Sequence, residues 1–265
     1  MKKIFLSILA AAAVLTASAQ LKAPQIIANG GYHKASEKGA RNSMSALKAA
    51  QKAKFYGSEC DVNLTKDGKI LIVQSGFHPS SKVKPRIDVQ RATAEKILEI
   101  PFRNGESVST LEQFLKRASK KPKTKLILDM KNQSVPKRET ELVKKVVAAV
   151  AAAGMEANVE YIADHPWTCF QLAKYAAKES KIHYLGGNYT PAYVKAMGGS
   201  GIDYQFDKLK KKKEWIKEAH KLGLTVNVWT VNRADQIRWC IQNGVDFITT
   251  DDPDLVKSVI KELCE

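Results

Sequence analysis

Short runs of β-branched residues alternate with longer helical stretches through almost the whole 265-residue chain. This alternation constrains the fold more than any single motif, because repeated strand–helix units form a mainly parallel sheet covered by helices. Nine runs predict strands, at 25–29, 58–64, 70–74, 125–130, 159–163, 182–185, 202–205, 225–230 and 246–250.

The stretches between these runs have the length and period of helices. Ser109-Thr110-Leu111-Glu112 predicts a capping box at a helix start, and Asn243-Gly244 predicts a helix end. The predicted helices cover 43–54, 111–120, 137–153, 167–178, 191–197, 212–222, 234–243 and 254–263.

The number of strand–helix units fits a closed TIM (β/α)8 barrel better than an open sheet, and the chain has the usual length of one such barrel. Nine strands exceed eight by one, and the hairpin-like turn at 65–68 indicates that one strand is an excursion. The stretch 76–108 has no clear period and predicts a small insertion over one end. No repeat or linker divides residues 20–265, so we expect one domain.

The first 19 residues have the layout of a secretory signal peptide. Lys2 and Lys3 precede an apolar run at 4–15, and the small residues Ala17-Ser18-Ala19 follow. We therefore expect export, to a periplasmic or secreted location, with cleavage after Ala19. A retained N-terminal anchor is the alternative, although the run is short for a membrane span.

Basic residues outnumber acidic ones by 43 to 27, a formal net charge of +16. Loss of two lysines with the signal peptide leaves 41 − 27 = +14. No nucleic-acid-binding motif accompanies the charge, so we expect no nucleic-acid partner. A positive chain of this kind can instead make peripheral contact with an anionic envelope surface.

Four cysteines are too few and too scattered for a disulfide-dense scaffold or a Cys-x-x-Cys metal site. In an exported protein they could form disulfides, and four cysteines allow three pairings that the sequence does not distinguish. They are Cys60, Cys169, Cys240 and Cys264.

Acidic residues lie on one face of two predicted strands. Glu59 and Asp61 are two apart, so they point to the same side of strand 58–64. Asp129 ends strand 125–130, with Lys131 two residues later. Three carboxylates converging at the rim of a barrel would suit Ca²⁺ or Mg²⁺. The alternative is that these acids are rim charges paired with Lys131 or another lysine.

A series of ordered motifs resembles the glycerophosphodiester phosphodiesterase family. The match runs from about residue 25 to residue 253, so it covers nearly the whole mature chain. The motifs are, in order, Ile27-Ala28-Asn29-Gly30-Gly31, Arg41-Asn42-Ser43, Glu59-Cys60-Asp61-Val62, Thr65-Lys66-Asp67-Gly68, Ile72-Val73-Gln74-Ser75, Ser109-Thr110-Leu111-Glu112, Asp129-Met130-Lys131, Asn227-Val228-Trp229-Thr230-Val231 and Gly244-Val245-Asp246-Phe247-Ile248-Thr249-Thr250-Asp251-Asp252-Pro253.

The resemblance implies a TIM barrel with a divalent metal held by Glu59, Asp61 and Asp129. In the family, two histidines act as general acid and base, and an arginine helps the metal to hold the phosphate. The resemblance also makes Lys131 a catalytic and substrate-binding candidate. Trp229 is a candidate for an apolar wall of the ligand site.

The chain departs from the family pattern at the catalytic positions. Asn29 and Gln74 stand where the family has its two histidines, and Gly30 stands at the place of its arginine. Ser75 replaces the aspartate that follows the second histidine, and Arg41 replaces the acid of the Glu-Asn-Thr motif. Amides form hydrogen bonds but do not exchange a proton near neutral pH, and loss of one general acid or base typically costs about 10²–10⁴-fold in rate.

We therefore expect a catalytically impaired binder of a phosphodiester or polyol-phosphate ligand. One alternative is an active phosphoric diester hydrolase of lipid metabolism that uses His33, His78 or metal-bound water in place of the histidine pair. Another is a scaffold or interaction protein that retains the barrel without using the site.

Overall fold

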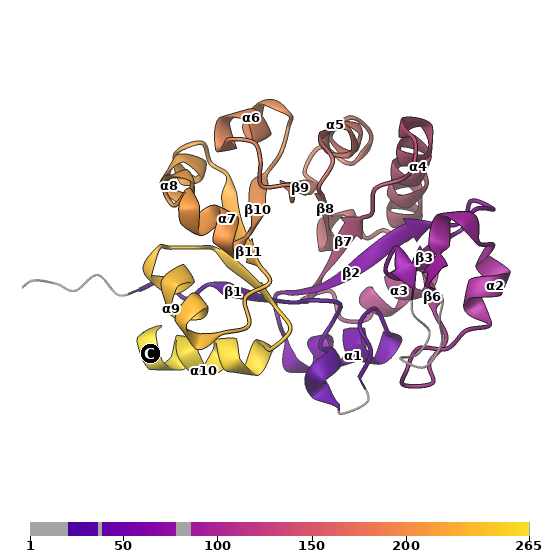
Figure 1. Cartoon of the computed structure of the whole chain (residues 1–265), viewed down its shortest axis with the longest axis horizontal. Coiled ribbons are helices and arrows are strands. Elements are labelled where there is room, and N and C mark those ends of the chain that lie inside the picture. The colour runs from indigo at the N-terminus through magenta and orange to yellow at the C-terminus, as the bar shows by residue number, and fades with distance from the viewer. Residues whose placement is uncertain (1–20, 37–38, 78–85, 265) are drawn as a thin grey trace, which may run out of the picture.

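Eight parallel strands close into a barrel at the centre of the computed structural model, which describes residues 21–36, 39–77 and 86–264. Strand β1 closes the ring because it pairs with both β12 and β2. The predicted TIM (β/α)8 barrel is thus confirmed (Figure 1). Its strands are β1 (Gln25–Ala28), β2 (Gly57–Leu64), β7 (Lys125–Met130), β8 (Val159–Ala163), β9 (Lys181–Tyr184), β10 (Gly201–Gln205), β11 (Thr225–Trp229) and β12 (Phe247–Thr250).

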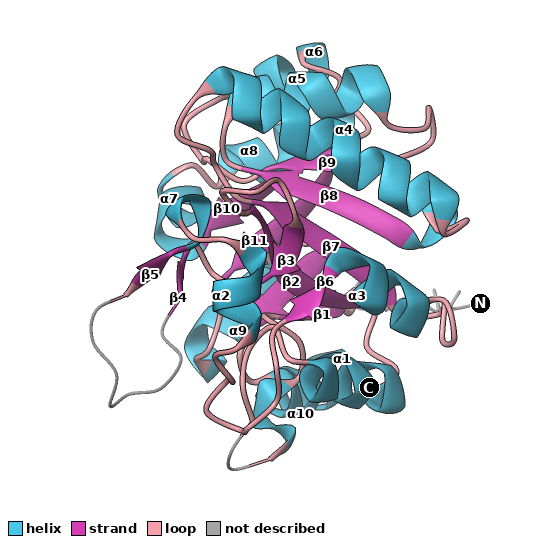
Figure 2. Ribbon diagram, turned by 90° about the vertical axis from the view of Figure 1, so that its right-hand side faces the viewer, coloured by secondary structure: helices cyan, strands magenta, loops and turns pink. Residues whose placement is uncertain are grey.

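The helices surround the barrel as an outer layer, which Figure 2 shows in a second view. They are α1 (Met44–Ala53), α3 (Leu111–Ala118), α4 (Pro136–Ala152), α5 (Pro166–Tyr175), α6 (Pro191–Ala196), α7 (Phe206–Lys211), α8 (Glu214–Lys221), α9 (Ala234–Gln242) and α10 (Pro253–Cys264). Among the described residues, none of the helices combines the length and the apolar character that crossing a membrane requires.

The ninth predicted strand is an excursion, as the turn at 65–68 indicated. Strand β3 (Ile70–Ile72) runs antiparallel to β2, and β6 (Ser109–Thr110) pairs with β3 at the outer edge. The insertion between them holds a small hairpin of β4 (Gly76–Phe77) and β5 (Ile87–Asp88), followed by α2 (Ala94–Leu98). Figure 1 shows α2 at the periphery, beyond β3 and β6.

Two local predictions need correction. The capping box at α3 uses Thr110 and Gln113, one residue later than the predicted Ser109 and Glu112. The predicted helix 212–222 is preceded by a separate helix, α7, whose first turn is capped by the side chain of Gln205. The predicted helix end is correct, since Asn243 caps α9 and Gly244 has a φ of +73°.

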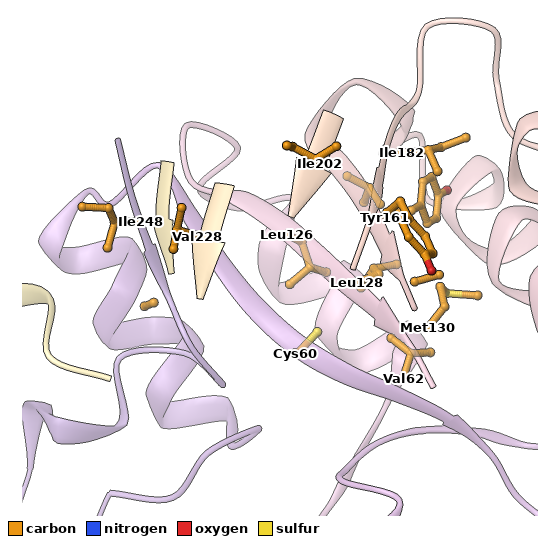
Figure 3. Packing of buried hydrophobic residues seen from close by; sticks show 14 of the residues in the cluster. Cys60, Val62, Leu126, Leu128, Met130, Tyr161, Ile182, Ile202, Val228 and Ile248 are labelled. Atoms are coloured by element: carbon orange, nitrogen blue, oxygen red, sulfur yellow. The ribbon is translucent and has the colours of Figure 1, made fainter. Parts of the chain in front are cut away.

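Residue alternation along the strands separates the two faces of the barrel wall. On the outer face, Cys60 and Val62 of β2 lie beside Leu128 and Met130 of β7, under the helices (Figure 3). On the inner face, the same two strands carry acidic side chains. The alternation thus delivers one apolar face to the helices and one polar face to the barrel mouth.

Three cysteines belong to the apolar packing. Cys60, Cys169 and Cys240 are buried and reduced, so the structure uses them as small core side chains. The signal-peptide prediction for residues 1–19 falls outside the described residues.

Candidate active site

A pocket of about 200 Å³ opens among the carboxyl ends of the barrel strands. Active sites of this fold lie at that end, because the loops that follow the strands converge there. The lining residues come from six of the barrel strands and from five loops: Asn29, Gly30, Arg41, Glu59, Asp61, Gln74, Asp129, Lys131, Ile162, Leu185, Asp203, Trp229, Thr230 and Thr249.

Three buried carboxylates meet in this pocket, as the strand pattern predicted. Glu59, Asp61 and Asp129 each place an oxygen within 4.8 Å of the others. Asp61 and Asp129 are register partners on the adjacent strands β2 and β7. The backbone N–H of Gly30 donates to Glu59 Oε2 at 2.6 Å, and Asn42 Nδ2 donates to Asp61 Oδ2 at 2.6 Å. Glu59 and Asp61 are therefore oriented by hydrogen bonds from the β1–α1 segment.

The charge of the cluster is only partly balanced by protein groups. Lys131 Nζ lies 2.5 Å from both Asp61 Oδ1 and Asp129 Oδ2. Burial raises the pKa of Asp129 to about 6, and Lys131 acts in the opposite direction. Burial, followed by repulsion from Asp61 and Asp129, raises the pKa of Glu59 well above its usual range.

When the three carboxylates and the Lys131 ammonium are all ionised, the cluster carries a net charge of −2. Hard oxygen ligands at this spacing fit Ca²⁺ or Mg²⁺, and a divalent ion would neutralise that charge. Glu59, Asp61 and Asp129 are the residues that would hold it. The alternative of paired rim charges describes only part of the cluster, because no lysine contact is found for Glu59 among the described residues.

Gln74 reaches the same pocket from the loop after β3. The third polar residue on the inner face of β2 positions this loop: Asn63 Nδ2 donates to the carbonyl of Val73 at 2.6 Å. Ser75 Oγ lies 3.3 Å from Asn63 Oδ1 on the other side of Gln74. Asn29 and Gln74, the two amides that the resemblance sets at the family's histidine positions, therefore line one pocket with the carboxylates.

Asp251, after β12, joins four polar side chains at the pocket rim. Asn29 Nδ2 donates to its Oδ1 at 2.8 Å, Arg41 NH2 at 2.7 Å, and His33 Nε2 lies 3.4 Å away. Asn232 Nδ2 donates to the other oxygen at 2.9 Å. Although burial acts to raise it, these partners hold the pKa of Asp251 well below its usual range.

The two histidines predicted as substitutes have different outcomes. His33 is buried against Asp251 and does not line the pocket. His78 lies outside the described residues. Trp229 lines the pocket, and its Nε1 donates to the carbonyl of Asp203 at 3.0 Å.

Sequence reasoning assigned no role to three residues that build the site. Asn42 and Asp251 stand in quoted motifs, but only the folded chain brings them against Asp61 and Asn29, which line the pocket. Asp203 lies on the inner face of β10, is 1% exposed, and has an Oδ1 without a hydrogen-bond partner among the described residues. Burial raises its pKa to about 8, although Asn227 beside it acts in the opposite direction. The local sequence around Asp203 does not reveal this burial or the raised pKa that follows from it.

The fold and the site can be compared with known proteins. A structure of a glycerophosphodiester phosphodiesterase from Parabacteroides distasonis is 31% identical, with a TM-score of 0.84, and the match covers 91% of this chain and 98% of that one. A phosphodiesterase from Oleispira antarctica, solved with the product sn-glycerol-3-phosphate, is 17% identical, with a TM-score of 0.73 over 90% of this chain and 97% of that one.

Sequence comparison gives the same result. The Bacillus subtilis protein YqiK, described as uncharacterized, is 25% identical over 233 residues, which are 83% of this chain and 93% of YqiK. A profile described as the glycerophosphoryl diester phosphodiesterase family matches residues 29–255. That range contains the barrel from the end of β1 to the start of α10, together with the carboxylate cluster. The chain therefore belongs to the glycerophosphoryl diester phosphodiesterase family.

Proposed function

We propose that this chain is an exported family member that binds a divalent cation and a phosphodiester or polyol phosphate, and that has lost the family's acid–base pair. One observation carries the proposal: the carboxylate cluster is complete, while Asn29 and Gln74 line the same pocket at the family's histidine positions. The site thus combines intact binding groups with side chains that do not exchange protons near neutral pH.

The roles of the side chains follow from their positions. Glu59, Asp61 and Asp129 hold the cation, which supplies positive charge for phosphate oxygens when bound. Asn29 and Gln74 offer amide hydrogen bonds to ligand hydroxyl or phosphate oxygens. The volume of about 200 Å³ suits a small ligand, and the Oleispira antarctica protein, which shares the fold, was solved with sn-glycerol-3-phosphate.

Cation and ligand binding are tested by calorimetric titration of the purified chain without residues 1–19. Ca²⁺ or Mg²⁺ is expected to bind the wild type and to raise its unfolding temperature, because only the folded state assembles the three carboxylates. Glu59→Gln is expected to lose both effects. Glu160→Gln is a matched control, since Glu160 is a buried glutamate of β8 that hydrogen-bonds Tyr56 and does not line the pocket. Equal cation binding by wild type and Glu59→Gln would refute the metal assignment.

Loss of the acid–base pair is tested by hydrolysis of glycerophosphodiesters. The double variant Asn29→His with Gln74→His is expected to exceed the wild type by about 10² or more, because it regains a general acid and a base. Substantial wild-type turnover that Glu59→Ala abolishes would instead show a working hydrolase and reject the impaired-binder proposal.

A working hydrolase is the second candidate function, and one observation favours it. Asp203 is a buried carboxyl of the pocket wall whose pKa of about 8 keeps it protonated near neutral pH. A protonated acid could donate to a leaving alcohol, as a histidine does elsewhere in the family. Turnover that disappears in Asp203→Asn and falls above about pH 8 in the wild type would favour this candidate.

Peripheral contact with an anionic envelope surface is also proposed, and exposed apolar residues near the mouth support it. Val135, Trp167, Phe170 and Tyr193 are 42–51% exposed and lie in or just before α4, α5 and α6, near the ends that follow the barrel strands. Aromatic side chains beside lysines are typical of interfacial binding. The wild type is expected to sediment with phosphatidylglycerol vesicles. The double variant Trp167→Ala with Phe170→Ala is expected to sediment with them less completely. Equal sedimentation of both proteins would reject the apolar contribution.

A further inference from the structure

Arg41 reaches the active-site pocket from the segment between β1 and α1. The next residue, Asn42, fixes the backbone of this segment. Asn42 adopts a φ of +62°, and its N–H donates to the Gly30 carbonyl at 2.9 Å. Its side-chain Nδ2 donates to Asp61 Oδ2, and its Oδ1 accepts from the Asp61 N–H. Ser43 then caps α1. The two residues that follow Arg41 thus fix the segment, and the Arg41 side chain lines the pocket.

Gly30 and Arg41 occupy one space. A Cβ placed on Gly30 would lie 2.6 Å from Arg41 Cβ and 2.9 Å from Arg41 Cγ, both closer than real carbon contacts allow. Gly30 also has a φ of +62°, a conformation that glycine adopts without strain. In this backbone, Arg41 can pass along the pocket wall only because residue 30 has no side chain.

The two cations of the pocket wall differ in their surroundings. Lys131 lies between two buried carboxylates, Asp61 and Asp129, so its charge is taken up by the metal-ligating cluster. Among the residues that the structure describes, Arg41 makes one carboxylate contact, from NH2 to Asp251, and its side chain is 40% exposed. A guanidinium carries five N–H donors in a planar fork, so further donors remain for an anion in the pocket.

We propose that Arg41 binds the phosphate oxygens of the ligand, and that position 30 is glycine because Arg41 occupies its space. The inference rests on the proposed function, since it assigns a residue to the same ligand. It also revises an expectation from sequence. The resemblance placed the family's phosphate-holding arginine at position 30, where this chain has glycine. The structure instead brings an arginine to that place from eleven positions later in the chain.

The binding role is tested with sn-glycerol 3-phosphate and with inorganic phosphate, titrated into the Mg²⁺-loaded protein. Arg41→Gln is expected to lower both affinities by about 10- to 100-fold, the usual effect of losing a hydrogen bond to a charged group. The affinities of Arg41→Lys are expected to lie between those of the wild type and Arg41→Gln, because lysine retains the positive charge without the planar fork of donors. The matched control is Arg238→Gln: Arg238 is 37% exposed and paired with Glu262, and it does not line the pocket.

The outcomes separate this inference from the proposed function. Wild-type binding that Arg41→Gln leaves unchanged would overturn the role of Arg41 while the proposed function stands. Absence of wild-type binding to both ligands would overturn the proposed function, and with it the binding role.

The shared space is tested without any ligand. In a double-mutant cycle by chemical unfolding, Gly30→Ala is expected to destabilise less in an Arg41→Gly background than in the wild type, because that background removes both clashing carbons. Additive effects would overturn the claim that Gly30 makes room for Arg41.

Discussion

Replacing Asp203 with asparagine is expected to make the stability of the protein less dependent on pH. Asp203 is 1% exposed on the inner wall of β10, and burial raises its pKa to about 8 from an ordinary 3.8. The folded state therefore holds this proton more tightly than the unfolded state. The contribution of protonated Asp203 to the free energy of unfolding is complete below about pH 4 and is lost as the pH rises toward 8.

The size of the effect follows from the two pKa values. Each pH unit between them costs about 1.4 kcal/mol, and the cost levels off above the folded pKa. Between about pH 5 and pH 8.5, the wild type should lose about 4 kcal/mol of unfolding free energy through Asp203 alone. Asp203→Asn has no proton to lose, and its amide is close in shape to the carboxyl.

The measurement is chemical unfolding of both proteins across this pH range, in a chelator so that no cation binds. The difference in unfolding free energy between Asp203→Asn and wild type should grow with pH by a few kcal/mol, while other acids titrate in both proteins and largely cancel. Asp207→Asn is the control, because Asp207 is exposed two residues after the end of β10. A difference that stays constant with pH would show that Asp203 is ionised in the folded protein and would refute the reasoning.

Three further predictions concern the site and the core. Asn42→Ala should lower the free energy of unfolding by about 2 kcal/mol, because it removes two buried hydrogen bonds to Asp61. A loss below about 0.5 kcal/mol in urea unfolding, roughly the effect of a surface substitution, would contradict this. Lys131→Met should destabilise the cation-free protein by about 3 kcal/mol, because it leaves buried carboxylates without their ammonium partner. The same variant should bind Ca²⁺ or Mg²⁺ more tightly in calorimetry, since an ammonium no longer competes for the carboxylates. Weaker cation binding would contradict this prediction. Burial raises the pKa of both Cys169 and Cys240 to about 12, so a thiol reagent at about pH 8 should label them only after unfolding, and rapid native labelling would show that they are accessible.

The strands were predictable because burial on both faces of a parallel sheet leaves apolar, β-branched runs that local sequence reveals. All nine predicted strands exist, and the hairpin turn identified the presence of the excursion β3. The errors arose where side-chain hydrogen bonds decide a local boundary. Gln205 caps α7, a helix that was not predicted, and Thr110 with Gln113 forms the capping box of α3 one residue later than predicted, although the helix begins at the predicted Leu111.

The candidate site divides along the same line. Glu59, Asp61 and Asp129 were identifiable because alternation places acids on one face of strands that are otherwise apolar, where burial is costly without a cation. The resemblance to the family, read from the sequence, also sets the amides Asn29 and Gln74 at its histidine positions. Motif order over nearly the whole chain was enough to identify that family.

Closure of the barrel decided the rest, because contact between residues far apart in the chain depends on which strands become neighbours. Pairing of β1 with β12 brings Asp251 to Asn29, and the β1–α1 segment folds back so that Arg41 fills the space beside Gly30. The pKa of Asp203 likewise depends on burial inside the ring, which local sequence does not contain. The sequence by itself thus determined the strand–helix repeat, the family and the three acids of the cluster. Only the tertiary structure decided that Arg41 lines the pocket beside Gly30 and that Asp203 is buried in its wall, since both depend on distances across the barrel.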